Sequence, residues 1–139
     1  MRRFVLDASV ALAWFVDRSI HPYAQEISER LQREDRALVP LFWRIEMANG
    51  FVMAERRGTL TASNITQALS QFEVVRSQSI DYSDESFPVR HLLTTARQFR
   101  LTAYDAEYLE TARVHQLPLA TLDRQLKEAA RQAGVDLLR

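Results

Sequence analysis

The sequence predicts an α/β domain in which a parallel β-sheet of about five strands lies between helices. Two observations support this fold class. Short apolar runs, too brief to be helical, alternate along the chain with longer segments whose apolar residues recur at helical spacing. The short runs are apolar at every position rather than at alternate positions, which is typical of parallel strands buried on both faces by helices. The connections between such strands are expected to be right-handed crossovers.

The first half of the chain is expected to form two strands and four helices. The strands are short apolar runs at residues 4–6 and 37–39, and Pro40 closes the second of them. Apolar residues at helical spacing, together with capping and terminating residues, predict the helices. These cover residues 8–16, 21–34, 41–57 and 61–71, with Pro22 opening the second, Gly58 ending the third and Thr61 capping the fourth.

The second half of the chain is expected to form three strands and three helices. The strands are predicted at residues 72–76 and 119–121, with a last edge strand at 135–138. The helices are predicted from Ser83 or Asp84 to about residue 100, from Thr102 to about 115, and from a cap at Asp123 to Gly134. No internal repeat, low-complexity segment or long linker interrupts the pattern, so residues 1–139 are expected to form a single domain.

The composition excludes several classes of chemistry. The 139 residues suit one core, and the absence of cysteine excludes disulfides, thiolate zinc sites and cysteine nucleophiles. No apolar stretch reaches the roughly 18 residues of a membrane span, and no signal cleavage pattern follows the first residues. We therefore expect a cytoplasmic protein. Net charge is zero, and Lys127 is the only lysine beside 17 arginines, a preference compatible with binding phosphate.

Two aspartates lie just beyond predicted strands. Asp7 follows the strand at 4–6, and Asp123 follows the strand at 119–121. Each precedes a helix, so each carboxylate could serve only as an N-cap for free backbone N–H groups. The carboxyl ends of parallel strands, however, meet at the edge of the sheet where ligands bind. Two carboxylates close together there repel by roughly 1–4 kcal/mol. A cation bound between them would make the net interaction favourable.

Two further acids are expected near that edge. Asp105 lies three residues after Thr102, a variant of the capping box, and as a residue at a helix start it can point into the same crevice. Glu46 lies in the helix at 41–57, which is apolar nearly all round and is expected to be buried. An unpaired carboxylate there costs several kcal/mol, and Arg44 does not face it. Exposure to solvent or an arginine from elsewhere could stabilise Glu46, and a metal ion is the explanation we favour.

The four acids come from four separate segments and are predicted to form a cage of oxygen ligands: Asp7, Glu46, Asp105 and Asp123. Such ligands select hard cations, Mg²⁺ or Mn²⁺.

Three polar residues are candidates to support that cage. Ser9 lies two residues after Asp7, and Thr121 lies two residues before the last of the acids. Either hydroxyl could orient a carboxylate or bind water, although packing would use it equally well. Asn49, one turn after Glu46, could hydrogen-bond its carboxylate or contact substrate.

The segments that carry these residues resemble the motifs of the PIN-domain family, and within it the VapC-like toxins of toxin–antitoxin pairs. The resemblance covers nearly the whole chain, in four motifs that occur in order: VLDASVALAW at 5–14, PLFWRIEMAN at 40–49, LTAYDAEYLETA at 101–112 and LATLD at 119–123. The departures are small. Ala8 stands where many members carry a hydroxyl, and Glu107 and Glu110 add acid near the third motif.

The resemblance implies a metal-dependent endoribonuclease with a five-stranded parallel sheet, acting as a homodimer. It also implies a cognate VapB-like antitoxin whose C-terminal segment covers the active-site groove, and substrates such as transfer or ribosomal RNA. On this hypothesis Asp7, Glu46 and Asp105 hold one Mg²⁺ or Mn²⁺, and Asp123 completes that site or supports a second ion. Asp123 or Glu46 would take the proton of the attacking water. Candidate phosphate-binding arginines are Arg2, Arg18, Arg44 and Arg97.

Three alternatives stay open at the level of sequence. A phosphotransferase or phosphatase would use an aspartyl nucleophile, but Asp7 lacks a second Asp two residues later, and Lys127 lies within a helix where a receiver domain would not place its lysine. A non-catalytic RNA- or partner-binding module would be expected to lack some of the four acids. A housekeeping RNA-processing nuclease would share the chemistry of the toxin, and the chain alone does not separate these two roles.

Overall fold

The computed structural model describes residues 1–17, 19 and 21–139. Over this part of the chain, four parallel strands form one sheet in the order β3-β2-β1-β4. The strands are β1 (Arg3–Leu6), β2 (Arg36–Val39), β3 (Ile80–Tyr82) and β4 (Leu119–Ala120). The predicted parallel α/β fold is confirmed. The predicted edge strand at 135–138 is reduced to a single parallel bridge between Leu119 and Leu137 beside β4.

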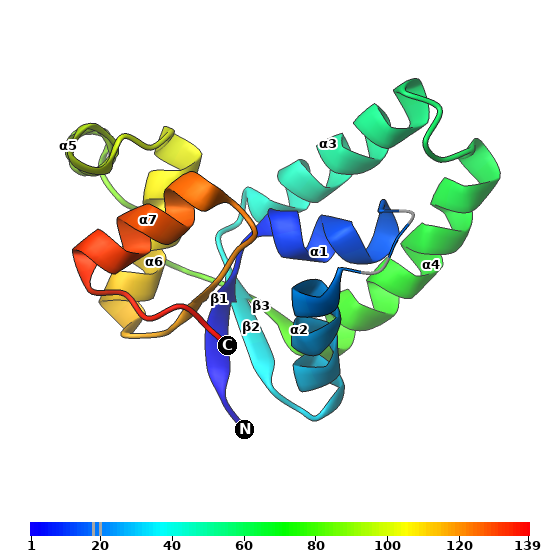
Figure 1. Ribbon diagram of the computed structural model, residues 1–139, viewed down its shortest axis with the longest axis horizontal. Helices are drawn as coiled ribbons and strands as arrows, with labels where there is room; N and C mark the ends of the chain where they lie inside the picture. The colour runs from blue at the N-terminus through cyan, green and yellow to red at the C-terminus, as the bar shows by residue number, and fades with distance from the viewer. Residues whose placement is uncertain (18, 20) are drawn as a thin grey trace.

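Helices cover both faces of this sheet (Figure 1). One group joins β1 to β2 and β2 to β3: α1 (Ala8–Phe15), α2 (Pro22–Gln32), α3 (Trp43–Arg56) and α4 (Ala62–Ser79). The other group lies on the opposite side: α5 (Val89–Phe99), α6 (Ala103–His115) and α7 (Arg124–Ala133). The sheet is therefore the middle of three layers, as parallel strands require.

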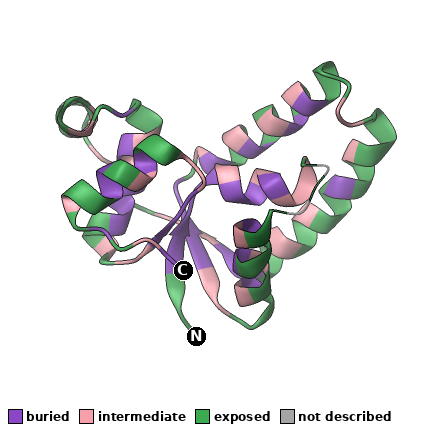
Figure 2. Cartoon of the chain, viewed as in Figure 1, coloured by how far each residue is buried: buried purple, intermediate pink, exposed green. Residues whose placement is uncertain are grey.

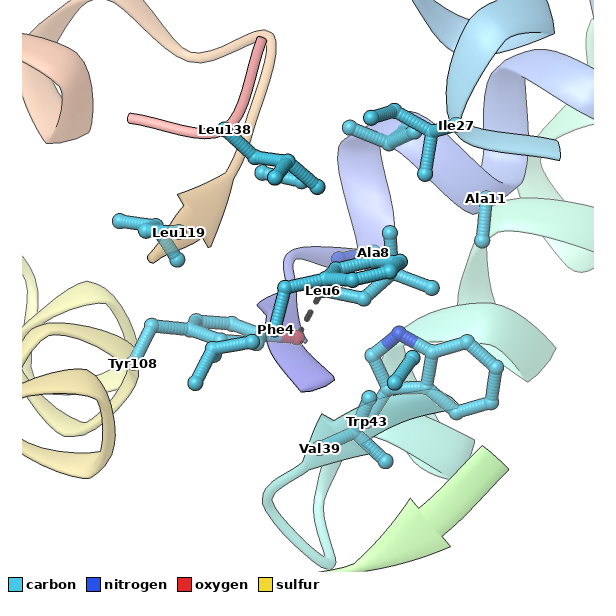
Figure 3. Packing of buried hydrophobic residues seen from close by; sticks show 14 of the residues in the cluster. Phe4, Leu6, Ala8, Ala11, Ile27, Val39, Trp43, Tyr108, Leu119 and Leu138 are labelled. Atoms are coloured by element: carbon cyan, nitrogen blue, oxygen red, sulfur yellow. Dashed lines mark hydrogen bonds between the residues drawn. The ribbon is translucent and has the colours of Figure 1, made fainter. Parts of the chain in front are cut away.

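The core is centred on the strands, which are the most completely buried part of the chain (Figure 2). In β1, Phe4, Val5 and Leu6 are fully inaccessible to solvent. Figure 3 shows the packing around them, with Tyr108 on one side of the sheet and Trp43 and Ile27 on the other. Burial on both faces explains why the strand sequences are continuously apolar.

The prediction of a strand at residues 72–76 is wrong, because α4 continues through this segment to Ser79 and β3 begins at Ile80. β-Branched and aromatic residues favour a strand locally, but tertiary packing favours a helix. Residues that pack on the core recur at spacings of three and four: Ile65, Ala68, Phe72, Val75 and Ser79. The ring of Phe72 stacks on Trp43 with a centroid separation of 5.7 Å. That stack is available only with Phe72 on a helical face.

The predicted start of the next helix at Ser83 or Asp84 is also wrong, since α5 begins at Val89. The Ser83 N–H donates to the carbonyl of Val39 and so continues the pairing of β3 with β2. The Ser83 hydroxyl then accepts a hydrogen bond from the N–H of Glu85 and forms a local turn. Pro88 stands at the N-cap in an extended conformation, and a proline disfavours helix in the residue before it.

None of the described helices is long and apolar enough to cross a membrane.

Candidate active site

The carboxyl ends of β1 and β4 lie side by side, because these two strands pair in parallel with Leu6 opposite Ala120. Asp7 and Asp123 therefore leave the sheet at the same edge. A pocket of about 510 Å³ opens there between α1 and α3. It is lined by all four predicted acids, Asp7, Glu46, Asp105 and Asp123, and also by Ser9 and Asn49.

Asp7 is buried, with 5% of its surface exposed, and it does not cap α1 although it stands at the N-cap position. Its Oδ2 instead accepts hydrogen bonds from the hydroxyls of Ser9 (2.7 Å) and Thr121 (2.6 Å). Burial raises the pKa of Asp7, and the nearby Asp123 raises it further, while the two hydroxyls act in the opposite direction. Asp7 is thus a buried carboxyl whose orientation is set by two side chains.

The backbone fixes which way these hydroxyls donate. The Ser9 oxygen accepts from the N–H of Leu122 (3.0 Å), and the Thr121 oxygen accepts from the N–H of Asp123 (3.0 Å). Because an amide N–H can only donate, each hydroxyl oxygen accepts from the backbone and donates its single proton to the carboxylate of Asp7. These bonds tie the start of α1 to the end of β4.

Asp105 lies in the first turn of α6, where the Thr102 hydroxyl caps the helix by accepting from the N–H of Asp105 (3.2 Å). The pKa of Asp105 is raised to about 7. Burial is the largest cause, followed by the negative charges of Asp7, Asp123 and Glu46. The Asp105 carboxyl therefore interacts electrostatically with all three of the other acids.

Glu46 is half-buried, and its environment differs from the prediction. The helix is not buried all round, since the side chain of Ile45 is 56% exposed and that of Val52 is 42% exposed. The partner of Glu46 is neither solvent alone nor an arginine but Tyr108, whose hydroxyl donates to Oε1 at 2.6 Å. Burial raises the pKa of Glu46, the hydrogen bond from Tyr108 lowers it, and Asp7 raises it.

Asp123 has two roles in the structure. Its Oδ1 accepts from the N–H of Leu126 at 2.9 Å and caps α7, as the sequence allowed. The same side chain lines the acidic pocket.

The donor chemistry of the pocket fits a hard divalent cation. Five carboxylates line it, Asp17 together with the four predicted acids, and Asp7, Asp123 and Glu46 raise the pKa of Asp105 by repulsion. The side-chain positions do not enclose such a cation. Across residues 1–17, 19 and 21–139, no three Asp, Glu, His or Cys side chains form a group that could hold a metal ion. Three of the acids already use an oxygen in a hydrogen bond: Asp7 with Ser9 and Thr121, Glu46 with Tyr108, and Asp123 with the cap of α7. The cage predicted from the sequence is therefore a shared pocket, not a closed set of ligands.

The structure also places the other predicted residues. Asn49 lines the pocket, and among the described contacts it makes no hydrogen bond to Glu46. Of the candidate arginines, Arg2 lines a different pocket, Arg44 and Arg97 do not line this one, and Arg18 lies outside the described residues.

Three polar residues of the site were not singled out from the sequence: Asp17 and Arg57, which line the pocket, and Tyr108, which contacts Glu46. Arg57, just beyond α3, lines the acidic pocket together with Met53 and Asn49. Their spacing of four residues places the three side chains on one face of α3, which was the available signal. Tyr108 lies three residues after Asp105, also at helical spacing, but nothing in the sequence indicates that it contacts Glu46.

The fold and the site together define a three-layer α/β protein with an acidic pocket at the carboxyl edge of a parallel sheet. This chain belongs to the PIN domain family, whose model matches residues 4–132. PIN domains are generally nucleases that act on nucleic acid and use divalent metal ions. Among solved structures, the chain is similar to the crystal structure of PAE2754 from Pyrobaculum aerophilum, with a TM-score of 0.65 and 25% sequence identity. The alignment covers 92% of this chain and 86% of that one. No curated protein sequence matches the chain.

Proposed function

We propose that this protein is a metal-dependent endoribonuclease whose active site is the acidic pocket at the carboxyl ends of β1 and β4. The observation that carries the proposal is the meeting of Asp7, Glu46, Asp105 and Asp123, from four segments of the chain, in one pocket. Mutual repulsion of this kind costs stability, and bound cations would offset it. Helix capping does not account for the placement of Asp7, whose carboxyl is held by the hydroxyls of Ser9 and Thr121.

In this mechanism, Asp7, Glu46 and Asp105 would hold Mg²⁺ or Mn²⁺, and Asp123 would complete the site or support a second ion. When bound, such a cation would supply a water of lowered pKa and offset negative charge on the phosphodiester. The hydroxyls of Ser9 and Thr121 hold Oδ2 of Asp7 and so fix the orientation of its carboxylate. Asp123 or Glu46 accepts the proton of the attacking water.

The test is cleavage of a total-RNA pool by the wild type and by Asp105→Asn, each with Mn²⁺ and with EDTA. Discrete cuts that require both Mn²⁺ and Asp105 are expected, and mapping the RNA ends identifies the substrate. Asp84→Asn is the matched control, because Asp84 is exposed in the loop before α5. Cuts that survive EDTA or the Asp105 substitution would contradict the proposal, and so would a wild type that leaves all RNA intact.

The narrower proposal is that this nuclease is the toxin of a VapBC-type pair. The order and spacing of the four sequence motifs support it. Expression of the wild type alone is expected to arrest growth, and co-expression of the small protein encoded beside it is expected to restore growth and to co-purify as an antitoxin. Normal growth on expression of an active nuclease would favour the housekeeping role instead.

A further inference from the structure

The hydroxyl of Tyr108 lies at the junction of three segments that carry acids. Tyr108 is fully buried on α6, one turn beyond Asp105. Its hydroxyl donates to Oε1 of Glu46 on α3 at 2.6 Å and lies 3.3 Å from the N–H of Ala8, the residue that follows Asp7. Figure 3 shows the contact with Ala8 as a dashed line from the phenol to the start of α1.

The direction of these hydrogen bonds follows from counting protons. A phenol has one proton, and the amide of Ala8 can only donate, so the oxygen of Tyr108 accepts from Ala8. The hydroxyl of Tyr108 therefore uses its single proton to donate a hydrogen bond to the carboxylate of Glu46. Rotation of the hydroxyl away from Glu46 is unfavourable, because it would leave a buried polar group without a hydrogen-bond partner. One oxygen of Glu46 is thereby held at a fixed place relative to α1 and α6.

The ring of Tyr108 is also held. The ring of Phe42, just before α3, packs edge-on against Tyr108 with a centroid separation of 5.4 Å. The same Phe42 ring packs against Tyr104, 5.2 Å away, whose side chain is 60% exposed. Any buried phenol needs a hydrogen-bond partner. The partner of Tyr108 is a carboxylate that lines the acidic pocket, so this contact links the core to the site.

We propose that Tyr108 is a positioning residue of the active site, whose hydroxyl fixes Oε1 of Glu46 so that the other oxygen is free to bind a cation. The inference rests on the proposed function of the acidic pocket. It assigns Tyr108 a role at the site without contact to the substrate. Groups that orient metal ligands in this way typically contribute 10–100-fold to metal affinity or activity.

The test compares Tyr108→Phe with Tyr104→Phe. Both variants lose one hydroxyl from α6, but only the first loses the hydrogen bond to Glu46. Mn²⁺ affinity, measured by electron paramagnetic resonance of free Mn²⁺, is expected to fall about 10-fold or more in Tyr108→Phe and to stay unchanged in Tyr104→Phe. In RNA cleavage, kcat is expected to fall with little change in KM. Near-ultraviolet circular dichroism in EDTA checks that both variants are folded.

Repeating the comparison in a Glu46→Gln background separates positioning from general structural damage. If Tyr108 acts through Glu46, Tyr108→Phe has little further effect on Mn²⁺ affinity once Glu46 is changed. Equal Mn²⁺ affinities for wild type and Tyr108→Phe, or an undiminished effect in the Glu46→Gln background, would overturn the inference. A wild type that binds no Mn²⁺ and cuts no RNA would instead overturn the proposed function, and this inference with it.

A measurement on the wild type covers the case in which Tyr108→Phe does not fold. A hydroxyl proton held between Tyr108 and Glu46 exchanges slowly and is expected to give its own ¹H resonance, which shifts as Mg²⁺ is added. A Tyr108 hydroxyl resonance that is unaffected by saturating Mg²⁺, or a hydroxyl that exchanges as fast as an exposed phenol, would contradict the inference.

Discussion

At the scale of single residues, similar sequence positions have different roles. Asp7 and Asp123 both follow a strand and precede a helix, and the sequence gives each the same two interpretations. In the structure, Asp123 caps its helix, whereas Asp7 is held by two hydroxyls and caps nothing. The location of both acids could be predicted, because parallel strands fix it. The partners could not, because Thr121 is 114 residues from Asp7 along the chain.

The same limit applies to Glu46. Its place in the pocket could be predicted from its place on an apolar helix, but its hydrogen bond to Tyr108 spans 62 residues of sequence. The segment at 41–57 is not completely buried as expected, since Leu41 and Ile45 are each 56% exposed. The sequence therefore predicted four of the acids that line the pocket, but neither Asp17 nor the contact of Tyr108 with Glu46.

Asp105 yields a prediction about stability and pH. The pKa of its carboxyl is about 7 in the folded protein and has the ordinary value of 3.8 in the unfolded chain. Between these two pH values, the folded protein keeps a proton on Asp105 that the unfolded chain has released. Stability consequently falls as the pH rises from about 4 to 7. Asn cannot ionise, so Asp105→Asn in EDTA is expected to be the more stable protein at pH 8, by about 1–2 kcal/mol after allowing for solvent screening of this partly exposed group.

Urea unfolding of both proteins at pH 4, 6 and 8 measures this difference. The advantage of Asp105→Asn should grow with pH and vanish near pH 4. The negative charge of Asp105 interacts favourably with the N-terminus of α6. This interaction stabilises the wild type by about 0.3–1 kcal/mol and so reduces the advantage of Asp105→Asn. A difference that stays constant across the three pH values would show that burial and the other acids do not raise the pKa of Asp105 in the folded protein.

At the scale of elements, the helices whose ends carry capping residues were predicted best. α6 begins after Thr102 and α7 ends at Gly134, which adopts the left-handed conformation that glycine favours. The extent of α4 was predicted worst, because its β-branched residues favour a strand locally and long-range packing, such as the contact between Phe72 and Trp43, favours the helix. Caps are local signals, whereas that contact is long-range.

Two adjacent arginines at the end of α3 allow a controlled test of substrate binding. Arg56 and Arg57 are both exposed, but only Arg57 lines the acidic pocket. On the proposed function, Arg57 is expected to contact an RNA phosphate near the site. Arg57→Ala should therefore weaken binding of single-stranded RNA and reduce the dependence of log affinity on log salt by about 0.7, the contribution of one phosphate.

Fluorescence anisotropy with a labelled single-stranded oligonucleotide, in the Asp105→Asn background to prevent cleavage, measures both quantities. Arg56→Ala removes the same charge from the neighbouring position and should leave the salt dependence unchanged. Equal losses in the two variants would indicate general electrostatic attraction, with no phosphate contact specific to Arg57.

At the scale of the whole molecule, the layered parallel fold could be predicted because it follows from the alternation of short apolar strands with helices. The sequence does not indicate how far the predicted fifth strand pairs with its neighbour. In the structure, the segment after Gly134 pairs with β4 through a single bridge at Leu137. The same topology brings acids from distant segments into one pocket. Cation binding should therefore stabilise the molecule as a whole.

Thermal unfolding measures this coupling. Mn²⁺ at about 100 times its dissociation constant is expected to add about 2.7 kcal/mol to the stability of the wild type, a rise of several degrees in Tm. Asp7→Asn removes a proposed ligand from the centre of the pocket, so its Tm should barely respond to Mn²⁺. Asp84→Asn should respond like the wild type. The same rise in Tm for Asp7→Asn as for the wild type would argue against Asp7 as a ligand.

The pairing of β1 with β4 has a consequence for the chain during its synthesis. Asp7 leaves the ribosome well before its neighbour in the sheet, because Thr121 follows it by 114 residues. Until β4 reaches the edge of β1, Asp7 lacks the Thr121 hydroxyl and the pocket lacks Asp123. The nascent chain therefore cannot complete the pocket until the residues that follow β4 have also emerged.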